Sequence, residues 1–298
     1  MTDQIDELAT AIAEKALLRL RAERSGQIEP TCGTATEQPK DCAPDGCAPC
    51  PENLSCGARA MADAGASRVT PASIRSSQDL AGLIDHTLLK PDATHEDIVK
   101  VCEEARRYGF ATVCVNLANV AVAARLLSGC PTVPIAVVGF PLGVGTTAAK
   151  VFETREAIRA GAREIDMVIN IGALKGKDHG SVLRDIQAVV EAARPAAVKV
   201  ILETGALSRD EKVIGCALAK AAGAAFVKTS TGFGPGGATA EDIALMRQVV
   251  GNDMGVKASG GIRSTADAKR MVEAGATRIG ASASVAIVTG TGPQAGKY

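Results

Sequence analysis

The alternation of apolar and polar segments from about residue 78 onward predicts a repeating β/α fold. Short apolar runs alternate with longer stretches in which apolar residues recur at helical spacing, such as Glu96–Tyr108 and Thr265–Ala274. Several of the short runs are continuously apolar, which is typical of strands covered on both faces. The strand candidates are Leu83–Thr87, Ala111–Asn116, Pro134–Phe140, Glu164–Asn170, Val198–Thr204, Ala225–Thr231, Val256–Ser259 and Arg278–Ser282. Eight such repeats in about 220 residues favour a TIM (β/α)8 barrel. A doubly wound open sheet is the alternative, although no Gly-x-Gly-x-x-Gly follows the first strand.

The first 77 residues follow two other patterns. Over residues 3–24, apolar residues recur at helical spacing opposite a charged side, which predicts one amphipathic helix with the stripe Ile5, Leu8, Ile12, Ala16 and Leu20. An isolated helix of this length is marginal in water, so the stripe needs a partner surface. Residues 25–77 lack periodicity and are rich in Gly, Pro, Ser and Cys, which predicts a flexible linker. The expected organisation is a helix over 1–24, a linker over 25–77 and a barrel over 78–298.

Charge and cysteine usage narrow the function classes. The 298-residue chain carries 33 basic and 33 acidic residues, so its charge gives no reason to expect nucleic acid or an anionic membrane as partner. No segment approaches the roughly 18 apolar residues of a membrane span. Nine cysteines, several in apparent strands, indicate a reducing, cytoplasmic setting. Cys47 and Cys50 form a Cys-x-x-Cys that could bind zinc or an iron–sulfur cluster with Cys42 or Cys56. The spacing matches no standard finger, so a thiol-bearing tether is favoured.

Two lysines lie in strand candidates that run into Gly-rich loops. Lys228 lies in FVKTSTGFGPGG and Lys257 lies in GVKASGGIRS. A free lysine has a pKa of about 10.4, and both burial and a neighbouring cation lower it. An amine that has lost its proton can attack a carbonyl carbon, so the pair favours Schiff-base chemistry. Ordinary ion-paired lysines at strand ends are the structural alternative.

Other polar residues interrupt the apolar strands, and they are Asp85, Cys114, Asp166 and Lys199. In a TIM barrel, polar residues at the carboxyl ends of strands form the active site. Buried charges are costly unless paired, so these side chains are candidates for one site. Asp166 would then lie beside a lysine amine. Lys199 has the weakest case, since a structural ion pair in the core would explain it equally well.

The last two strand candidates are followed by a second kind of signal. They run into Gly260-Gly261-Ile262-Arg263 and Gly280-Ala281-Ser282. Phosphate sites in TIM barrels are commonly built from the loops after strands 7 and 8, where glycines let backbone N–H groups approach the phosphate. The sequence therefore predicts a phosphate site downstream of the two lysines.

These motifs resemble the deoxyribose-phosphate aldolases, which are class I, Schiff-base enzymes. The resemblance covers about Asp79 to Val288 and rests on LIDHTLLKPDAT, ATVCVN, GFPLG, EIDMVIN, KVILET, FVKTSTGF, KASGGIR and IGAS. It implies that Lys228 forms the imine, that Lys257 lowers its pKa, and that Asp166 acts with a water in proton transfer. It also implies a substrate pocket of Asp85, Cys114, Lys199 and Thr231, and a phosphate site of Gly232, Gly260, Gly261, Arg263, Gly280 and Ser282.

The implied reaction is reversible cleavage of 2-deoxy-D-ribose 5-phosphate to D-glyceraldehyde 3-phosphate and acetaldehyde. A protonated imine is itself an electron sink, so neither a metal nor a cofactor is expected. Some relatives have a lysine where this chain has Phe233, so the phosphate would be held with less charge. Some also end in a tyrosine whose tail reaches the active site, and this chain ends at Tyr298. A homo-oligomer is expected.

The N-terminal extension resembles the encapsulation peptides of enzymes carried inside bacterial microcompartments, with residues 3–24 binding a shell protein. A disordered or self-associating extension is the alternative. Two other functions stay open, namely a Schiff-base aldolase acting on a different sugar phosphate, and a non-catalytic barrel that serves as a cargo adaptor.

Overall fold

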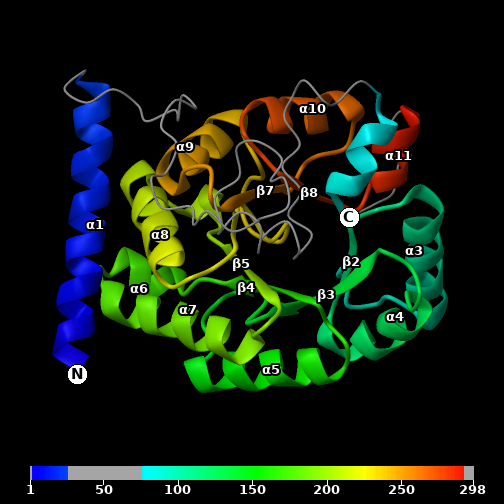
Figure 1. The fold of residues 1–298 in the computed structure, drawn as a ribbon, viewed down its shortest axis with the longest axis horizontal. Coiled ribbons are helices and arrows are strands. Elements are labelled where there is room, and N and C mark those ends of the chain that lie inside the picture. The colour runs from blue at the N-terminus through cyan, green and yellow to red at the C-terminus, as the bar shows by residue number, and fades with distance from the viewer. Residues whose placement is uncertain (1, 26–75, 292–298) are drawn as a thin grey trace, which may run out of the picture.

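The predicted barrel is confirmed in the computed structural model, which describes residues 2–25 and 76–291. Eight parallel strands follow one another around a closed barrel, with β8 paired to β1 (Figure 1). The strands are β1 (Ile84–Leu88), β2 (Thr112–Val115), β3 (Val133–Val138), β4 (Glu164–Val168), β5 (Ala197–Ile201), β6 (Phe226–Lys228), β7 (Gly255–Ser259) and β8 (Arg278–Ala281).

Helices cover the outside of the barrel and connect successive strands. Three of them begin with capping boxes, in which Thr94, Ser208 and Ser264 exchange hydrogen bonds with the acidic residue three positions later. The helices are α1 (Thr2–Arg24), α3 (His95–Tyr108), α4 (Val120–Leu126), α5 (Thr147–Arg159), α6 (Ile171–Lys175), α7 (His179–Ala193), α8 (Arg209–Ala221), α9 (Ala240–Val250), α10 (Thr265–Glu273) and α11 (Ser284–Thr289), with short 3-10 turns η2 (Gln78–Leu83), η3 (Leu117–Asn119) and η4 (Thr204–Ala206).

The predicted strands are right in number and order, but several of them end earlier in the structure than the sequence pattern predicts. The sixth was expected to reach Thr231, whereas β6 ends at Lys228, and the fifth was expected to reach Thr204, whereas β5 ends at Ile201. Apart from Leu202, the residues between the observed and the expected ends are polar, and they form loops at one mouth of the barrel. The strand register places Asp166 beside Lys199 and Lys228 beside Lys257.

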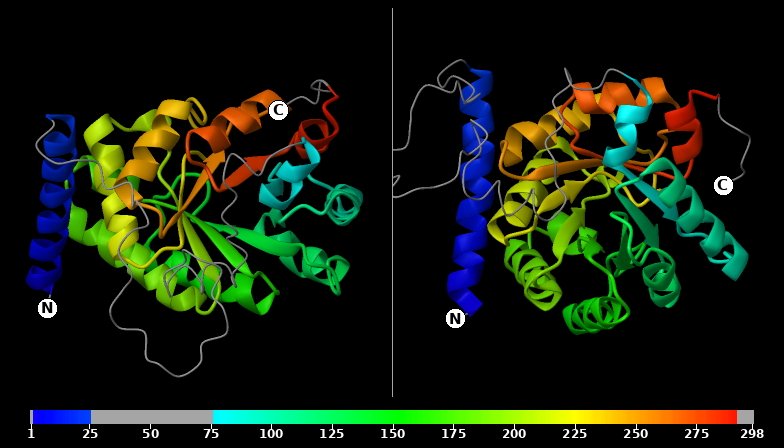
Figure 2. Two further views of the ribbon diagram at one scale, coloured as in Figure 1. Left: turned by 45° about the horizontal axis from the view of Figure 1, so that its top comes forward. Right: turned by 45° about the vertical axis from the view of Figure 1, so that its right-hand side comes forward.

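Helix α1 is not a free appendage. It lies along the outer surfaces of α7 and α8 (Figure 2). Ala9, Ala13 and Leu20 are buried there, and Asp6 forms an ion pair of 2.6 Å with Arg184 on α7. The barrel itself therefore supplies the partner surface that an amphipathic helix needs.

The predicted stripe of α1 is mostly correct. Ile5, Ile12, Ala16 and Leu20 pack against the barrel, but Leu8 is 53% exposed and points away from it. Leu18 is exposed as well. The expected linker, with its five cysteines, falls almost entirely on residues 26–75, outside the described residues. Across the two described ranges, no helix combines the length and apolar character needed to span a bilayer.

Candidate active site

Three lysines surround one carboxylate inside the barrel. Asp166 on β4 accepts hydrogen bonds at Oδ2 from Lys228 Nζ (2.8 Å) and Lys257 Nζ (2.7 Å), and at Oδ1 from Lys199 Nζ (3.1 Å). All four side chains are buried. The strand register brings them together, because β4 to β7 are consecutive neighbours in the barrel.

A second layer of charges lies beneath the first. Asp85 on β1 pairs with Lys257 Nζ at 2.5 Å and with the Arg278 guanidinium at 2.7 Å, and it accepts a hydrogen bond from Thr112. Glu164 pairs with Lys199 and, at 3.4 Å, with Arg278. Every charged side chain in the cluster thus has an opposite charge in direct contact, which offsets the cost of burial.

The cluster contains four basic side chains and three carboxylates. The basic groups are Lys199, Lys228, Lys257 and Arg278, and the acidic groups are Asp85, Glu164 and Asp166. If all seven were ionised, the buried cluster would carry one unbalanced positive charge, which a low-dielectric interior disfavours. The charges of the cluster balance when one of the amines is neutral. The pKa shifts indicate which amine this is.

The pKa values of Lys228 and Lys257 move in opposite directions. Burial lowers the pKa of Lys228, and the positive charge of Lys257 lowers it further, against the opposing effect of Asp166. Burial also lowers the pKa of Lys257, but Asp166 and Asp85 more than offset this and hold it above its ordinary value. Burial raises the pKa of Asp166, but the three lysines outweigh burial and hold this pKa well below its usual range. Lys228 is therefore the amine that loses its proton most easily.

Lys228 also faces open space. A cavity of about 240 Å³ lies at the carboxyl ends of the strands, and Lys228 forms part of its wall. Thr231 lines this cavity, as do all six residues expected to bind phosphate: Gly232, Gly260, Gly261, Arg263, Gly280 and Ser282. Gly260 requires glycine, since its φ is +90° and an added Cβ would lie 3.1 Å from Gly237 Cα.

The other expected pocket residues lie deeper. Asp85, Cys114 and Lys199 each have 0% exposure and do not line the cavity. Burial raises the pKa of the Cys114 thiol to about 11, so this cysteine is not poised as a nucleophile. Asp85 and Lys199 are linked to Lys228 through the ion pairs that they make with Lys257 and Asp166.

The sequence interpretation missed two members of the cluster, Glu164 and Arg278. Each is a charged residue at the beginning of a mostly apolar strand. A charge within an apolar strand is also the feature that singled out Asp166, so the sequence contained the signal for both residues. It also missed Glu203, a buried carboxylate directly after KVIL. Within the described ranges, no group of His, Cys, Asp or Glu side chains is arranged to hold a metal ion.

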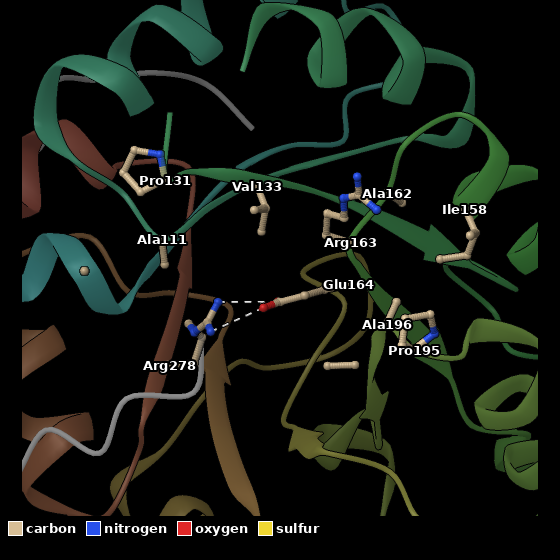
Figure 3. Close-up of a pocket in the computed structure, with 12 residues that line it drawn as sticks. Ala111, Pro131, Val133, Ile158, Ala162, Arg163, Glu164, Pro195, Ala196 and Arg278 are labelled. Atoms are coloured by element: carbon tan, nitrogen blue, oxygen red, sulfur yellow. Dashed lines mark hydrogen bonds and ion pairs between the residues drawn. The ribbon is translucent and has the colours of Figure 1, made fainter. Parts of the chain in front are cut away.

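A larger cavity, of about 510 Å³, opens at the opposite, amino-terminal mouth of the barrel. Figure 3 shows the Arg278 guanidinium and the Glu164 carboxylate meeting there among apolar side chains such as Val133 and Ile158. Both charged groups are already paired, and Lys228 is not part of this wall. Lys228, the amine with the lowered pKa, lines the cavity at the other, carboxyl-terminal mouth.

A closed (β/α)8 barrel with a cluster of buried lysines and carboxylates beneath a cavity at the carboxyl ends of its strands is the architecture of a barrel enzyme. Residues 80–296 match the model of the DeoC/LacD family of aldolases, and the chain belongs to this family. It is therefore a carbon–carbon lyase.

The relatives agree with this assignment. A deoxyribose-phosphate aldolase of Halalkalibacterium halodurans is 62% identical over 216 residues, which cover 72% of this chain and 96% of the relative. A crystal structure of a putative deoxyribose-phosphate aldolase from Coccidioides immitis superposes with a TM-score of 0.70 at 42% identity, covering 79% of this chain and 96% of that one. The structure of the deoxyribose phosphate aldolase of Aeropyrum pernix, described as a unique tetrameric structure, superposes with a TM-score of 0.68 at 34% identity. The match covers 78% of this chain and 96% of that one.

Proposed function

We propose that this enzyme cleaves 2-deoxy-D-ribose 5-phosphate reversibly to D-glyceraldehyde 3-phosphate and acetaldehyde through a Schiff base on Lys228. The observation that carries the proposal is the position of Lys228. Its amine is the member of the buried cluster with a lowered pKa, and it is the one that borders the cavity. The relatives named as deoxyribose-phosphate aldolases support the choice of substrate.

The chemistry follows from a neutral amine beside fixed charges. The Lys228 nitrogen attacks the C1 aldehyde of the open-chain sugar, water leaves, and a protonated imine forms. The C2–C3 bond then breaks, its electron pair moves toward the imine, and the C3 hydroxyl loses its proton to give the aldehyde of glyceraldehyde 3-phosphate. The remaining enamine takes up a proton at C2, and hydrolysis releases acetaldehyde.

The neighbouring charged groups have separate roles in this scheme. Asp166 is ionised before the reaction and, through a water molecule, takes up the proton that leaves the C3 hydroxyl and returns a proton to C2 of the enamine. Lys257 remains protonated, keeps the pKa of Lys228 low and holds Asp166 in place. Asp85 and Lys199 position Lys257 and Asp166 from below.

The far end of the same cavity suits a phosphate group. Gly232, Gly260, Gly261 and Gly280 bring backbone to its surface, and Ser282 and Arg263 add a hydroxyl and a positive charge. Helix α10 begins just beyond Arg263, so its N-terminal dipole adds to the attraction. Phe233 lies at the cavity wall and packs edge-on against Phe140, with ring centroids 5.4 Å apart.

An assay of acetaldehyde release from 2-deoxy-D-ribose 5-phosphate tests the proposal directly. We expect turnover by the purified chain in the presence of a chelator, and none by Lys228→Ala. Turnover of another sugar phosphate in place of this one would assign the protein to a different aldolase reaction. Inactivity with every aldehyde donor would favour a non-catalytic barrel.

We propose further that the protein acts in the cytoplasm as a homo-oligomer and that α1 recruits another protein, as encapsulation peptides recruit shell proteins. The free thiols at Cys102, Cys114, Cys130 and Cys216 are consistent with a reducing compartment. Exposed Leu8 and Leu18 on the outer side of α1 provide apolar contacts, while its inner stripe is occupied by α7 and α8.

A fluorescent protein fused to the full chain, in which α7 and α8 cover the inner stripe of α1, tests recruitment in a host that produces microcompartment shells. Co-localisation with shells is expected, and Leu8→Glu combined with Leu18→Glu should abolish it. If the unmutated fusion stays diffuse, α1 serves the barrel alone.

A further inference from the structure

Glu203 adopts a backbone conformation that a side chain disfavours. Its φ and ψ are 58° and 64°, in the left-handed region. Among the described residues, a positive φ occurs at thirteen glycines but at only two residues that carry a side chain, Glu203 and Lys177. Lys177 is exposed, whereas Glu203 is buried. Backbone strain of this kind persists where the surrounding structure holds the residue in place, and it is common at functional sites. It therefore indicates that the Glu203 carboxylate has a specific role.

The Glu203 carboxylate is directed at Thr231, the third residue of the β6–α9 loop. Glu203 Oε2 accepts hydrogen bonds from the Thr231 backbone N–H (3.2 Å) and from the Thr231 hydroxyl (2.5 Å). Thr231 Oγ1 in turn accepts from the N–H groups of Phe233 (3.0 Å) and Gly234 (3.3 Å). Because the hydroxyl proton points at Glu203, its lone pairs are free to accept both amides. Glu203 therefore fixes the turn that the loop makes from Thr231 to Gly234.

The loop also packs directly on Glu203. A Cβ added at Gly234 would lie only 2.6 Å from Glu203 Cδ. The second carboxylate oxygen, Oε1, is buried and has no hydrogen-bond partner within residues 2–25 and 76–291. A half-satisfied carboxylate in a strained backbone is a poor source of stability, so its value lies in the shape it gives the loop. Gly232, Phe233 and Gly236 of that loop line the cavity.

We propose that Glu203 is a positioning residue that holds the β6–α9 loop in the shape that binds the phosphate end of the substrate. This inference rests on the proposed function. Glu203 would then set the affinity for phosphorylated substrates and leave the carbon–carbon chemistry at Lys228 unaffected.

Two substitutions that truncate the Glu203 side chain test its role with little risk to folding. Glu203→Gly removes the carboxylate and also relieves the backbone strain, and Glu203→Asn tolerates the same backbone but is too short to reach Thr231 as glutamate does. Glu203→Gln keeps one acceptor oxygen and is the conservative rescue. Leu207→Ala, in the same β5–α8 connection, removes buried apolar volume but no hydrogen bond to Thr231, so it is the control for general destabilisation.

We expect KM for 2-deoxyribose 5-phosphate to rise by about 10-fold or more in Glu203→Gly and Glu203→Asn, with Glu203→Gln within about 3-fold of wild type. The kcat/KM for unphosphorylated 2-deoxyribose should stay within about 3-fold in all three variants, and the dissociation constant for inorganic phosphate should follow KM. Leu207→Ala should lower the melting temperature without changing KM.

An unchanged KM in both truncations, an equal loss with both substrates, or a Glu203→Gln variant as impaired as Glu203→Gly would each overturn the proposal. If the wild type does not cleave the phosphorylated sugar, the proposed function fails instead. The phosphate dissociation constant, which needs no turnover, then decides the role of Glu203 separately: weaker binding in the truncations supports it, and unchanged binding refutes it.

Discussion

Replacing Lys257 by methionine tests how the positive charge beside the reactive amine controls it. The Nζ atoms of Lys228 and Lys257 lie 2.8 and 2.7 Å from the same oxygen of Asp166, so they are at most about 5.5 Å apart. Two unit charges at about 5.5 Å repel by about 3 kcal/mol at an effective dielectric constant of about 20. Without this repulsion, the protonated form of Lys228 is stabilised by its ion pair with Asp166, and the pKa of Lys228 rises.

The rate should then fall most at neutral pH. Below the pKa of the amine the rate follows the unprotonated fraction, so a loss of about 3 kcal/mol lowers imine formation by about 100-fold. As the pH is raised, the variant should recover a large part of the lost rate, because the nucleophile itself is intact. The assay is the pH dependence of kcat/KM, read as acetaldehyde released.

Lys150→Met is the matched control. Lys150 is also fully buried and forms an ion pair of 2.5 Å, with Asp185, but it lies on α5 and has no contact with Asp166. Both variants break a buried pair and should lose stability. Only Lys257→Met should move the pH profile. A uniform loss of rate at all pH values, or the same shift in Lys150→Met, would refute the electrostatic role of Lys257.

Three other predictions follow from the structure. Ala9→Glu places a charge in the fully buried face of α1, so it should release the helix to limited proteolysis with kcat unchanged, whereas Leu8→Glu on the exposed face should not. Phe233→Lys should lower KM for the phosphorylated sugar by about 3- to 10-fold in low salt and less in high salt, because the residue borders the phosphate-binding end of the cavity; an increase in KM would contradict this. Since the folded pKa of Asp166 is depressed, its contribution to stability is present above the unfolded value of about 3.9 and is lost as the pH falls further. The melting temperature should therefore drop below about pH 4, and Asp166→Asn should show less of this drop.

The barrel could be predicted from the sequence because both sides of each strand are covered, so the strands read as continuous apolar runs. The polar residues that interrupt those runs identified Asp166, Lys228 and Lys257, since charges inside an apolar strand are uncommon. The carboxyl ends of β5 and β6 could not be placed, because the loop residues that follow them, such as Leu202 and Thr229, are as buried as strand residues.

Two other features depended on the three-dimensional structure. The position of α1 follows from the shape of the surface between α7 and α8, which no periodicity in residues 3–24 reveals. Periodicity also counted Leu8 as part of the buried stripe, and only the docked helix shows that it faces outward. The role of Glu203 depends on a backbone angle and on a contact with Thr231, 28 residues away along the chain, so residue type alone gave little indication of it.

The most direct test of the central claim is to identify the residue that forms the Schiff base. The protein is incubated with acetaldehyde, the imine is reduced with borohydride, and the modified peptide is sequenced by mass spectrometry. We predict one ethyl group on Lys228, no modification of the fully buried Lys199 and Lys257, and no trapped adduct in Lys228→Ala. An adduct on Lys257, or one that persists in Lys228→Ala, would contradict the assignment of Lys228 as the nucleophile.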